Sequence, residues 1–340
     1  MSPAHPESST AARVVAALRE AGDGSISGEA LAQRLGVSRA AIWKAISGLR
    51  GDGFVVEAVS GQGYRLVRVP DRVRAELVEP WLMAKRLGRR LVCLDHTEST
   101  MSDASLLARA GEPEGTVVVA ETQEAGRGRR GRVWHSPPGL NLYFSLLLRP
   151  ALPTHRVGPL TLVVGLALAR AVEGLAGVSP RLKWPNDLHC GGRKLAGILT
   201  ELSAELDAVH HVVVGVGVNV NADTQDFPEP LRGLATSLCL ESGGRKFDRA
   251  QVLAAFLSEL EPAYDRFVGA GLEPFLADIE SRSASRGRTI EVEVGNQRVT
   301  GIARGIRLDG ALIVELAGGE IVALHSGEIV TMSGEGDRSC

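Results

Sequence analysis

The sequence predicts an α+β protein built from three consecutive parts, and three observations carry this prediction. Residues 1–70 show the pattern of short helices followed by a glycine-tipped hairpin, residues 80–282 alternate strands with helices, and residues 284–334 contain only short strands and turns. Several central strands follow one another directly, so the central sheet is expected to be mixed, in an α+β layer arrangement.

The composition is that of an ordinary soluble globular protein, with 44% hydrophobic and 23% charged residues and a formal net charge of −2. The four cysteines lie far apart without metal-ligand spacing, which argues against disulfides and zinc and fits a reducing cytoplasm. The N-terminal segment MSPAHPESST has no apolar signal core. The longest apolar run, Leu160–Ala169, is about half the roughly 20 residues that span a bilayer, so we expect a buried helix and no membrane partner.

The first part has the element order of a winged helix-turn-helix. Thr10–Glu20 is periodic as a helix, Ile26 suits a short strand, Ser27 can cap a helix that ends at Leu35, and Ser38 can cap a third helix. Two strands, Phe54–Val59 and Tyr64–Val67, then surround a glycine-containing turn.

The third helix of this part is the candidate DNA-reading element. Ile42, Ala45, Ile46 and Leu49 follow the helical repeat of a core-facing stripe. In a winged helix-turn-helix the opposite face enters the major groove. That face carries Ser38, Arg39, Ala40, Trp43, Lys44 and Ser47. The basic footprint is modest and suits a homodimer on operator DNA; the alternative is a small helical domain that mediates protein contacts.

The second and third parts are read from hydrophobic periodicity and turn signals. Expected central strands are Leu91–Leu94, Thr116–Glu121, Leu140–Leu148, Leu182–Trp184, Ile198–Leu206 and His211–Val220; expected central helices are Leu160–Leu175, Asp248–Phe267 and Glu273–Ile279. Expected strands of the third part are Thr289–Val294, Gln297–Ile306, Ala311–Leu316 and Ile321–Ser326, which suggest a small β-barrel of SH3-like size.

Residues 126–132 read GRGRRGR, followed by Val133 and Trp134. Glycines let backbone amides approach an anion closely, and arginine donates planar, bidentate hydrogen bonds to carboxylate or phosphate. The loop can therefore order around a small polyanion and be disordered without it. The alternatives are a solvated basic loop or a strip that binds nucleic acid.

A second polar cluster, KWPND followed by RKLAGI, contains two lysines eleven residues apart, Lys183 and Lys194. On adjacent strands joined by a hairpin they can converge on one anion, although hairpin lysines are usually only surface residues. Pro185 forces a turn, and Asn186 and Asp187 suit a polar turn that can hold a cation or a ribose. A third cluster, GVGVNVN, is a glycine-thinned strand with Asn219 near its end.

These motifs, in this order and spacing, make the chain resemble the bifunctional biotin–protein ligases, in which a DNA-binding head also makes the enzyme a repressor of biotin synthesis. The resemblance runs from about residue 12 to residue 332. It implies a central domain of the biotin/lipoate ligase type. It also implies a two-step reaction: biotin and MgATP form biotinyl-5′-AMP and pyrophosphate, and biotin then passes to a lysine of a biotin carboxyl carrier domain.

The same resemblance implies the site residues. The biotin or biotinyl-adenylate contacts would be Ser99, Thr100, Met101, Gln123, Arg127, Gly128, Arg129, Lys194 and Gly197; the ATP side would be Arg132, Trp134, Lys183, Asn186, Asp187 and Asn219, with Asp187 as the Mg²⁺ ligand. Lys194, Arg129 and Lys183 would carry catalysis.

One residue departs from the family pattern, which usually reads Ser-Thr-Asn where this chain has Ser99-Thr100-Met101. Methionine cannot supply an amide hydrogen bond, so either that contact is dispensable or replaced, or biotin binds more weakly. Two other functions fit parts of the chain. A lipoate ligase shares the chemistry but would not be expected to carry these motifs, and a transcription factor without ligase activity would not explain the converging cations.

Overall fold

The structure is a computed structural model, and it describes residues 9–70, 72–205 and 208–333. The polar segment 1–8, Leu206 at the end of one expected strand and Gly334 at the end of the expected barrel lie outside the described residues. The chain divides into two compact units, Met1–Met83 and Ala84–Cys340, and each is described by itself.

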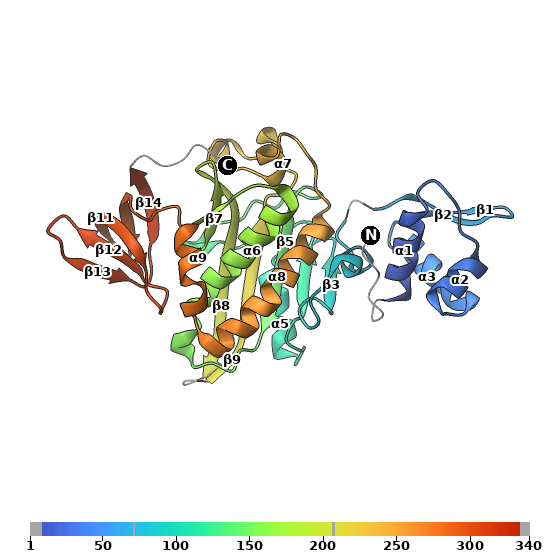
Figure 1. The fold of residues 1–340 in the computed structure, drawn as a ribbon, viewed down its shortest axis with the longest axis horizontal. Helices are drawn as coiled ribbons and strands as arrows, with labels where there is room; N and C mark the ends of the chain where they lie inside the picture. Colours follow the sequence, from blue (N-terminus) through green and yellow to red (C-terminus); the bar gives the residue numbers. More distant parts are fainter. Residues whose placement is uncertain (1–8, 71, 206–207, 334–340) are drawn as a thin grey trace. The chain divides into compact units, whose positions relative to one another are not determined.

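The first unit contains the helices and the hairpin that the sequence predicts (Figure 1). Its elements are α1 (Thr10–Glu20), α2 (Gly28–Leu35), α3 (Arg39–Gly51), β1 (Val55–Val59), β2 (Gly63–Arg68), α4 (Ala75–Val78) and the 3-10 turn η1 (Glu79–Trp81). β1 and β2 pair antiparallel, and the short strand expected at Ile26 is an isolated bridge to Tyr64.

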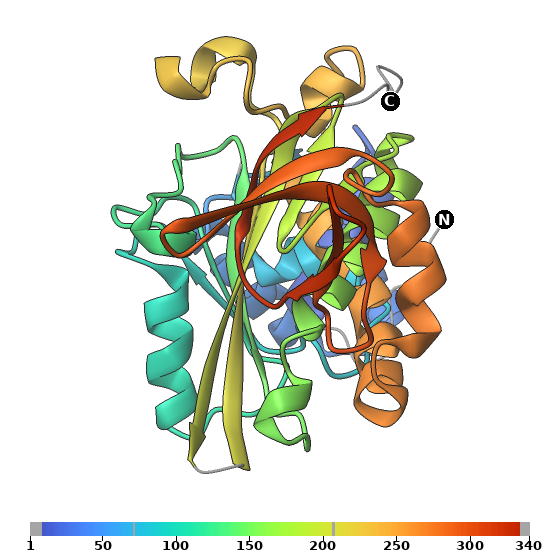
Figure 2. The ribbon, with the colours of Figure 1, turned by 90° about the vertical axis from the view of Figure 1, so that its left-hand side faces the viewer.

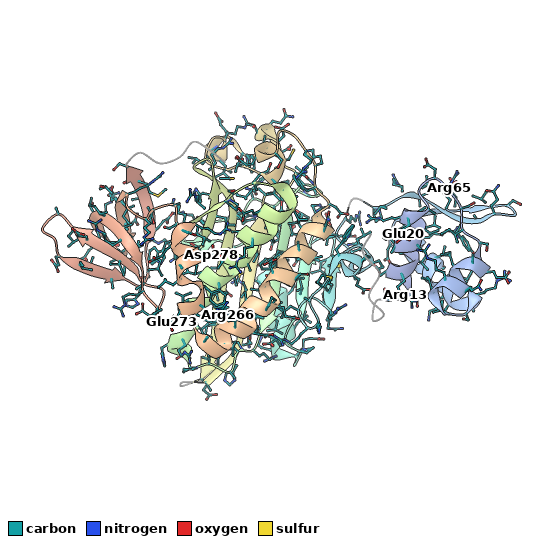
Figure 3. The ribbon with its side chains drawn as sticks, in the orientation of Figure 1. Arg13, Glu20, Arg65, Arg266, Glu273 and Asp278 are labelled. Carbon is teal, nitrogen blue, oxygen red and sulfur yellow. The ribbon has the colours of Figure 1, made fainter. Side chains whose placement is uncertain are left out.

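Local sequence signals set the helix ends of this unit. The side chains of Ser27 and Ser38 each accept a hydrogen bond from the backbone amide three residues later, which satisfies a free donor of the first turn. Gly36 ends α2 with φ of 65°, a left-handed conformation that favours glycine. Arg13, labelled in Figure 3, donates to the carbonyl of Leu35 and so ties α1 to the end of α2.

The second unit is built on a seven-stranded sheet, and the predicted mixed character is confirmed. Its order is β3 (Leu91–Leu94), β4 (Val117–Ala120), β5 (Leu142–Leu148), β9 (Ala208–Val218), β8 (Arg193–Glu205), β7 (Asp187–Cys190) and β6 (Arg181–Lys183). β3 and β4 pair parallel, and every other neighbouring pair is antiparallel.

Helices cover both faces of this sheet, as Figures 1 and 2 show. They are α5 (Thr100–Arg109), α6 (Leu160–Ala176), α7 (Leu238–Glu241), α8 (Arg249–Ala270) and α9 (Leu276–Ser281), with 3-10 turns η2 (Arg129–Gly131), η3 (Thr154–Arg156), η4 (Thr224–Asp226), η5 (Glu229–Leu231) and η6 (Glu273–Phe275). Leu199 of β8 packs on the cluster that contains α5, whereas Gly165 of α6 faces the preceding residue of β8, Ile198. Successive strand residues point to opposite faces, so α5 and α6 lie on opposite sides of the sheet.

α6 is a core helix, as its apolar sequence predicts. Of the described residues, Thr154–Ala176 is long and apolar enough to cross a bilayer by length and composition, but 67% of its most apolar window is buried inside the molecule. The helix packs against α8, and Arg170 at its exposed side donates to Asp278 of α9, which Figure 3 labels. Its apolar character therefore serves the interior of this unit.

The third predicted part is a five-stranded antiparallel sheet whose strands curl around a common centre (Figure 2). The strands are β10 (Thr289–Val294), β11 (Gln297–Ile306), β12 (Leu312–Leu316), β13 (Ile321–Leu324) and β14 (Glu328–Ser333), in the order β13-β12-β11-β10-β14. The Trp184 indole of the central part donates to Gly310 O over 3.0 Å, so this sheet packs directly on the seven-stranded one.

Among the described helices and strands of the second unit, the sequence does not predict α5, β7, α7 and β14. Asn186 and Asp187 have low strand propensity and suggest a polar turn where β7 forms; Gly191 and Gly192, both with positive φ, make the turn that pairs β7 with β8. The Thr and Ser residues of α5 resemble a loop. β14 begins at Glu328, directly after a glycine, and closes the sheet against β10.

Candidate active site

A cavity of about 430 Å³ opens on the α5 side of the seven-stranded sheet. Three chain segments supply most of its polar lining: the end of β4 with the arginine loop, the turn from β6 into β7, and the start of β8. Every residue expected at the site lines this one cavity: Ser99, Thr100, Met101, Gln123, Arg127, Gly128, Arg129, Arg132, Trp134, Lys183, Asn186, Asp187, Lys194, Gly197 and Asn219.

Glycines on two neighbouring strands make the room for this cavity. A Cβ at Gly217 would lie 2.4 Å from the Trp134 ring, and one at Gly215 would lie 2.6 Å from the Met101 sulfur. Gly197, paired with Gly217, also lies under the indole. The alternating valines of β9 point to the other face and pack in the core. The GVGV pattern therefore produces one packed face and one open face.

One end of the cavity carries neutral hydrogen-bonding groups. The Gln123 carboxamide oxygen accepts from Thr100 N over 3.0 Å and from its hydroxyl over 3.2 Å, and its nitrogen donates to the Ser136 hydroxyl. The buried Ser99 hydroxyl has no hydrogen-bond partner among the residues that the structure describes. This end suits a ligand that is polar but uncharged.

Met101, the residue that departs from the family pattern, is 3% exposed and packs with Ala104, Val118 and Val213. Where the family pattern has the amide of asparagine, this chain therefore has an apolar side chain in the cavity lining. Because the methionine side chain is part of the core under α5, this position offers no side-chain amide to a ligand.

Positive charge gathers at the other end of the cavity. Lys194 Nζ lies 2.8 Å from an Asp187 carboxylate oxygen and 5.4 Å from the centroid of the Trp134 ring. Burial lowers the pKa of Lys183, and the nearby charge of Asp187 partly offsets this effect. The Asn186 amide donates to Ile198 O over 2.7 Å and fixes the turn between the strands.

The sequence predicts that the two lysines lie on adjacent strands joined by one hairpin, and this prediction is wrong. β7 lies between β6, which carries Lys183, and β8, which carries Lys194. Convergence arises because Asp187 of β7 pairs in register with both Lys183 and Gly197. A carboxylate thus separates the two ammonium groups, which lowers their mutual repulsion.

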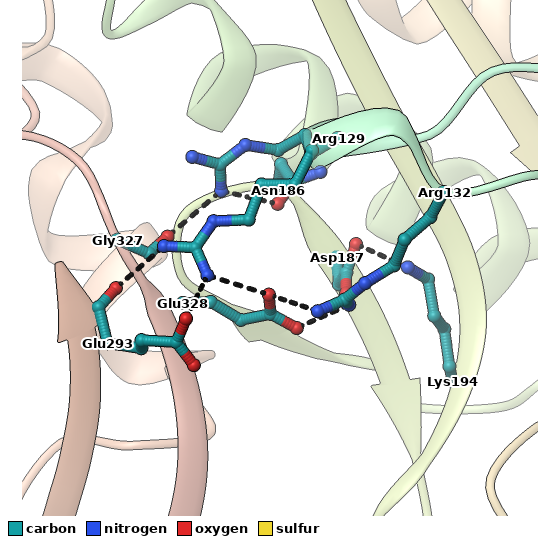
Figure 4. Close-up of polar contacts among 9 residues, drawn as sticks. Arg129, Arg132, Asn186, Asp187, Lys194, Glu293, Gly327 and Glu328 are labelled. Atoms are coloured by element: carbon teal, nitrogen blue, oxygen red, sulfur yellow. Dashed lines mark hydrogen bonds and ion pairs between the residues drawn. The ribbon is translucent and has the colours of Figure 1, made fainter. Parts of the chain in front are cut away.

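The arginine loop is folded around acidic partners (Figure 4). Arg132 donates two hydrogen bonds to the Glu328 carboxylate, at 2.5 and 2.6 Å, and Arg130 binds Glu293 at 3.0 Å. Arg129 donates to Gly327 O over 3.1 Å. The sequence predicts that this loop can order around a small anion and be disordered without it; in the structure, carboxylates of β10 and β14 contact its arginines.

The electrostatics of Glu328 match this role. Burial alone would raise its pKa, but the hydrogen bond and charge of Arg132, with the charges of Arg130 and Lys183, lower the pKa below 4.5. A lowered pKa in the folded protein means that the pairing is complete above about pH 4.5 and is lost as the pH falls through the lowered value.

The sequence does not predict several of the residues that line the cavity. His189 and Glu328 reach the cavity from β7 and β14, and a loop after β9 adds Phe227, Leu231 and Leu234. Leu234 is 65% exposed, as an apolar residue at the rim of an open cavity would be. The sequence feature that could have indicated these loop residues is the presence of large apolar side chains in a segment rich in proline and glycine.

The expected DNA-reading face of α3 is exposed. Ile42, Ile46 and Leu49 are each 1% exposed and form the inner stripe, whereas Ala45 is half-buried. Ser38, Arg39, Ala40, Trp43, Lys44 and Ser47 all lie on the surface. Trp43 keeps 65% of its surface exposed, which is unusual for so large an apolar side chain.

Comparison with known proteins identifies all three parts. Residues 94–219 match the biotin/lipoate A/B protein ligase family, residues 10–65 match an HTH domain, and residues 287–332 match the biotin protein ligase C terminal domain.

Individual relatives cover most of the chain. It is 40% identical over 296 residues to the bifunctional ligase/repressor BirA of Bacillus spizizenii, covering 87% of this chain and 91% of that protein. It is 38% identical to the biotin–[acetyl-CoA-carboxylase] ligase of Mycobacterium tuberculosis, covering 73% and 93%. The structure of the Aquifex aeolicus biotin protein ligase with biotin and ATP superposes with a TM-score of 0.63 and 32% identity, covering 72% and 100%.

The acidic anchor of the arginine loop yields a prediction. In Glu328→Gln the loop loses the charged partner of Arg132, and a partly exposed ion pair contributes about 0.5–1 kcal/mol, so the loop should open about two- to fivefold more often. Limited trypsin digestion should cut after the loop arginines faster by that factor. Glu315→Gln, which breaks an ion pair with Arg304 elsewhere in the same sheet, is the matched control. Equal cleavage of wild type and Glu328→Gln would contradict the anchor.

Proposed function

Because the chain belongs to the bifunctional ligase/repressor BirA family, it is a biotin protein ligase with a helix-turn-helix repressor domain, and we propose how its cavity performs the reaction. The enzyme forms biotinyl-5′-AMP from biotin and ATP and then transfers biotin to a lysine of a carrier domain. The observation that carries our assignment is one cavity with neutral hydrogen-bonding groups at one end and converging cations at the other.

We assign the neutral end to the ring system of biotin. Its ureido group is polar and uncharged, so it suits the free Ser99 hydroxyl and the Thr100–Gln123 pair, with Met101 against the apolar part of the ring. The carboxylate of biotin then points toward the cations. The residues proposed to contact biotin or its adenylate are Ser99, Thr100, Met101, Gln123, Arg127, Gly128, Arg129, Lys194 and Gly197.

We assign the cationic end to ATP. The residues proposed for this side are Arg132, Trp134, Lys183, Asn186, Asp187 and Asn219. Among the described residues no group of three or more His, Cys, Asp or Glu side chains could hold a metal on its own. That fits Mg²⁺, which commonly binds through one or two carboxylates plus substrate phosphates, and Asp187 would be its protein ligand. When bound, Mg²⁺ would neutralise phosphate charge.

The reaction requires two anions to meet. The carboxylate oxygen of biotin attacks the α-phosphorus of ATP, a new C–O–P bond forms, and the bond to pyrophosphate breaks. Lys194, placed between Asp187 and the indole of Trp134, would bridge the carboxylate and the α-phosphate. Lys183 and Arg132 would stabilise the charge that moves onto pyrophosphate. Arg129 would close the loop over the adenylate and exclude water.

We also propose how the whole protein is organised. Residues 1–70 would form the domain that binds operator DNA. The protein would act as a homodimer in the cytoplasm. Residues 80–282 would form the catalytic domain and 284–334 the C-terminal domain. Support comes from the exposed basic face of α3 and from the separate compact unit that contains it.

Removing the bridging charge should stop the first step. In Lys194→Ala we expect adenylate formation to fall about 10²–10³-fold, by analogy with loss of one donor to a developing oxyanion. The measurement is pyrophosphate release with biotin and MgATP. Arg193→Ala, which removes a neighbouring cation that pairs with Glu241, is the control. Release within twofold of wild type in Lys194→Ala would refute this role.

Opening the loop should make the enzyme leaky. Arg129→Gly removes the hydrogen bonds to Asn186 and Gly327, so the adenylate should escape and label lysines of bystander proteins. A streptavidin blot of a mixture of carrier domain and serum albumin measures both products. Background labelling of albumin beside normal labelling of the carrier would show that Arg129 does not retain the intermediate.

The two activities should separate by point mutation. In Arg39→Ala/Lys44→Ala, binding to biotin-operon promoter DNA should be lost while carrier biotinylation stays normal. In each single variant, affinity should depend less steeply on salt, with a slope smaller by about one for each phosphate that the variant no longer binds. Wild-type binding should also strengthen with biotin and ATP together. Arg34→Ala on α2 is the control. Wild-type affinity with the wild-type salt slope in the double variant would exclude this face.

A further inference from the structure

A buried ion pair lies outside the lining of the cavity and is not explained by substrate contact. Arg249, in the first turn of α8, is 4% exposed, and its guanidinium lies 2.8 Å from the Glu121 carboxylate, which is also buried. The same Arg249 nitrogen donates to Asn141 O over 3.0 Å. None of these three residues lines the cavity.

The three residues mark one edge of the sheet. Glu121 follows β4, Asn141 precedes β5, and the Asn141 side chain accepts from the backbone of Val220, which follows β9. β4, β5 and β9 are neighbours and pair antiparallel, so the end of β4, the start of β5 and the end of β9 meet at this edge. Arg249 therefore joins the ends of β4 and β5, and the Asn141 side chain joins them to the end of β9.

These strand ends lead to opposite sides of the proposed site. Gln123, two residues after Glu121, fixes the backbone and hydroxyl of Thr100 on the biotin side. Asn219, directly before Val220, lines the cavity on the ATP side. Because the attack of biotin on ATP needs both reactants in one geometry, the relative position of these two strand ends matters to the first step.

A buried ion pair is a weak source of stability, because desolvation of both charges offsets much of their attraction. Its directional hydrogen bonds do restrict geometry. From this placement we infer that Arg249, with Glu121 and Asn141, is a positioning residue that sets the alignment of the biotin and ATP subsites. This inference rests on the proposed assignment of those subsites.

The two steps of the reaction depend on this alignment to different degrees. Adenylate formation needs two separate molecules to be aligned, whereas transfer starts from one molecule in which the anhydride already joins both halves. Loss of the Arg249 hydrogen bonds should therefore slow the first step and spare the second. General damage to the fold would slow both.

The test uses the full-length protein and the double variant Glu121→Met/Arg249→Met. Replacing both charges by apolar side chains of similar length leaves no unpaired buried charge, so the fold should persist. Arg249→Gln is the second variant. We expect kcat for pyrophosphate release to fall about 30- to 100-fold, with KM for biotin and for ATP each within about threefold, since a small misplacement costs up to about 10²-fold. Carrier labelling from supplied biotinyl-5′-AMP should stay within about threefold.

Tyr264→Phe is the matched control. Tyr264 lies on the same helix and donates to Glu114 over 2.7 Å, so it also links α8 to β4, but near the start of that strand. It should leave both steps within about twofold. The inference is overturned if the double variant forms adenylate at the wild-type rate, if transfer falls as much as adenylation, or if Tyr264→Phe gives the same pattern. A wild-type protein that forms no adenylate would refute the proposed subsites instead.

Discussion

The balance of charge at one end of the cavity is the constraint on which the rest of the site depends. Several cations must converge there to bring two anionic substrates together, and without substrate their repulsion has to be offset. The protein supplies carboxylates for this purpose: Asp187 lies beside Lys194, and Glu328 binds Arg132. Substrate anions can then pair with cations that these carboxylates have already held close together.

This constraint explains why the C-terminal sheet belongs to the site. Glu293 and Glu328 come from β10 and β14, yet they hold a loop that follows β4 more than 150 residues earlier, with Arg130 and Glu293 separated by 163 positions. A loop of glycines and arginines has few apolar contacts of its own. Its conformation therefore depends on acidic partners that a packed second sheet keeps in place, with Trp184 among the contacts between the sheets.

The open face of the sheet depends on a second, steric constraint. Side chains at Gly197, Gly215 and Gly217 would occupy the positions of the Trp134 ring or the Met101 side chain. The valines between them keep the other face packed against the helices. One strand pattern thus serves stability on one face and ligand binding on the other, which is why glycine recurs there at every second residue.

The sequence by itself determined the helix ends around Ser27, Leu35 and Ser38, the three-part order and the mixed sheet, because caps and periodicity act within a few residues of each other. The cavity residues that it named followed from the resemblance of its motifs to a known family, and Glu328 and His189 were not among them. The sequence also identified Met101 as a departure from the family pattern. Only the tertiary structure decided which partners these residues meet. It placed β7 between the two lysines, Glu328 against the arginine loop, and Arg249 between Glu121 and Asn141. Each of these contacts joins positions far apart in the chain, and their distances are fixed by packing of whole sheets and helices, which no local pattern of residues encodes.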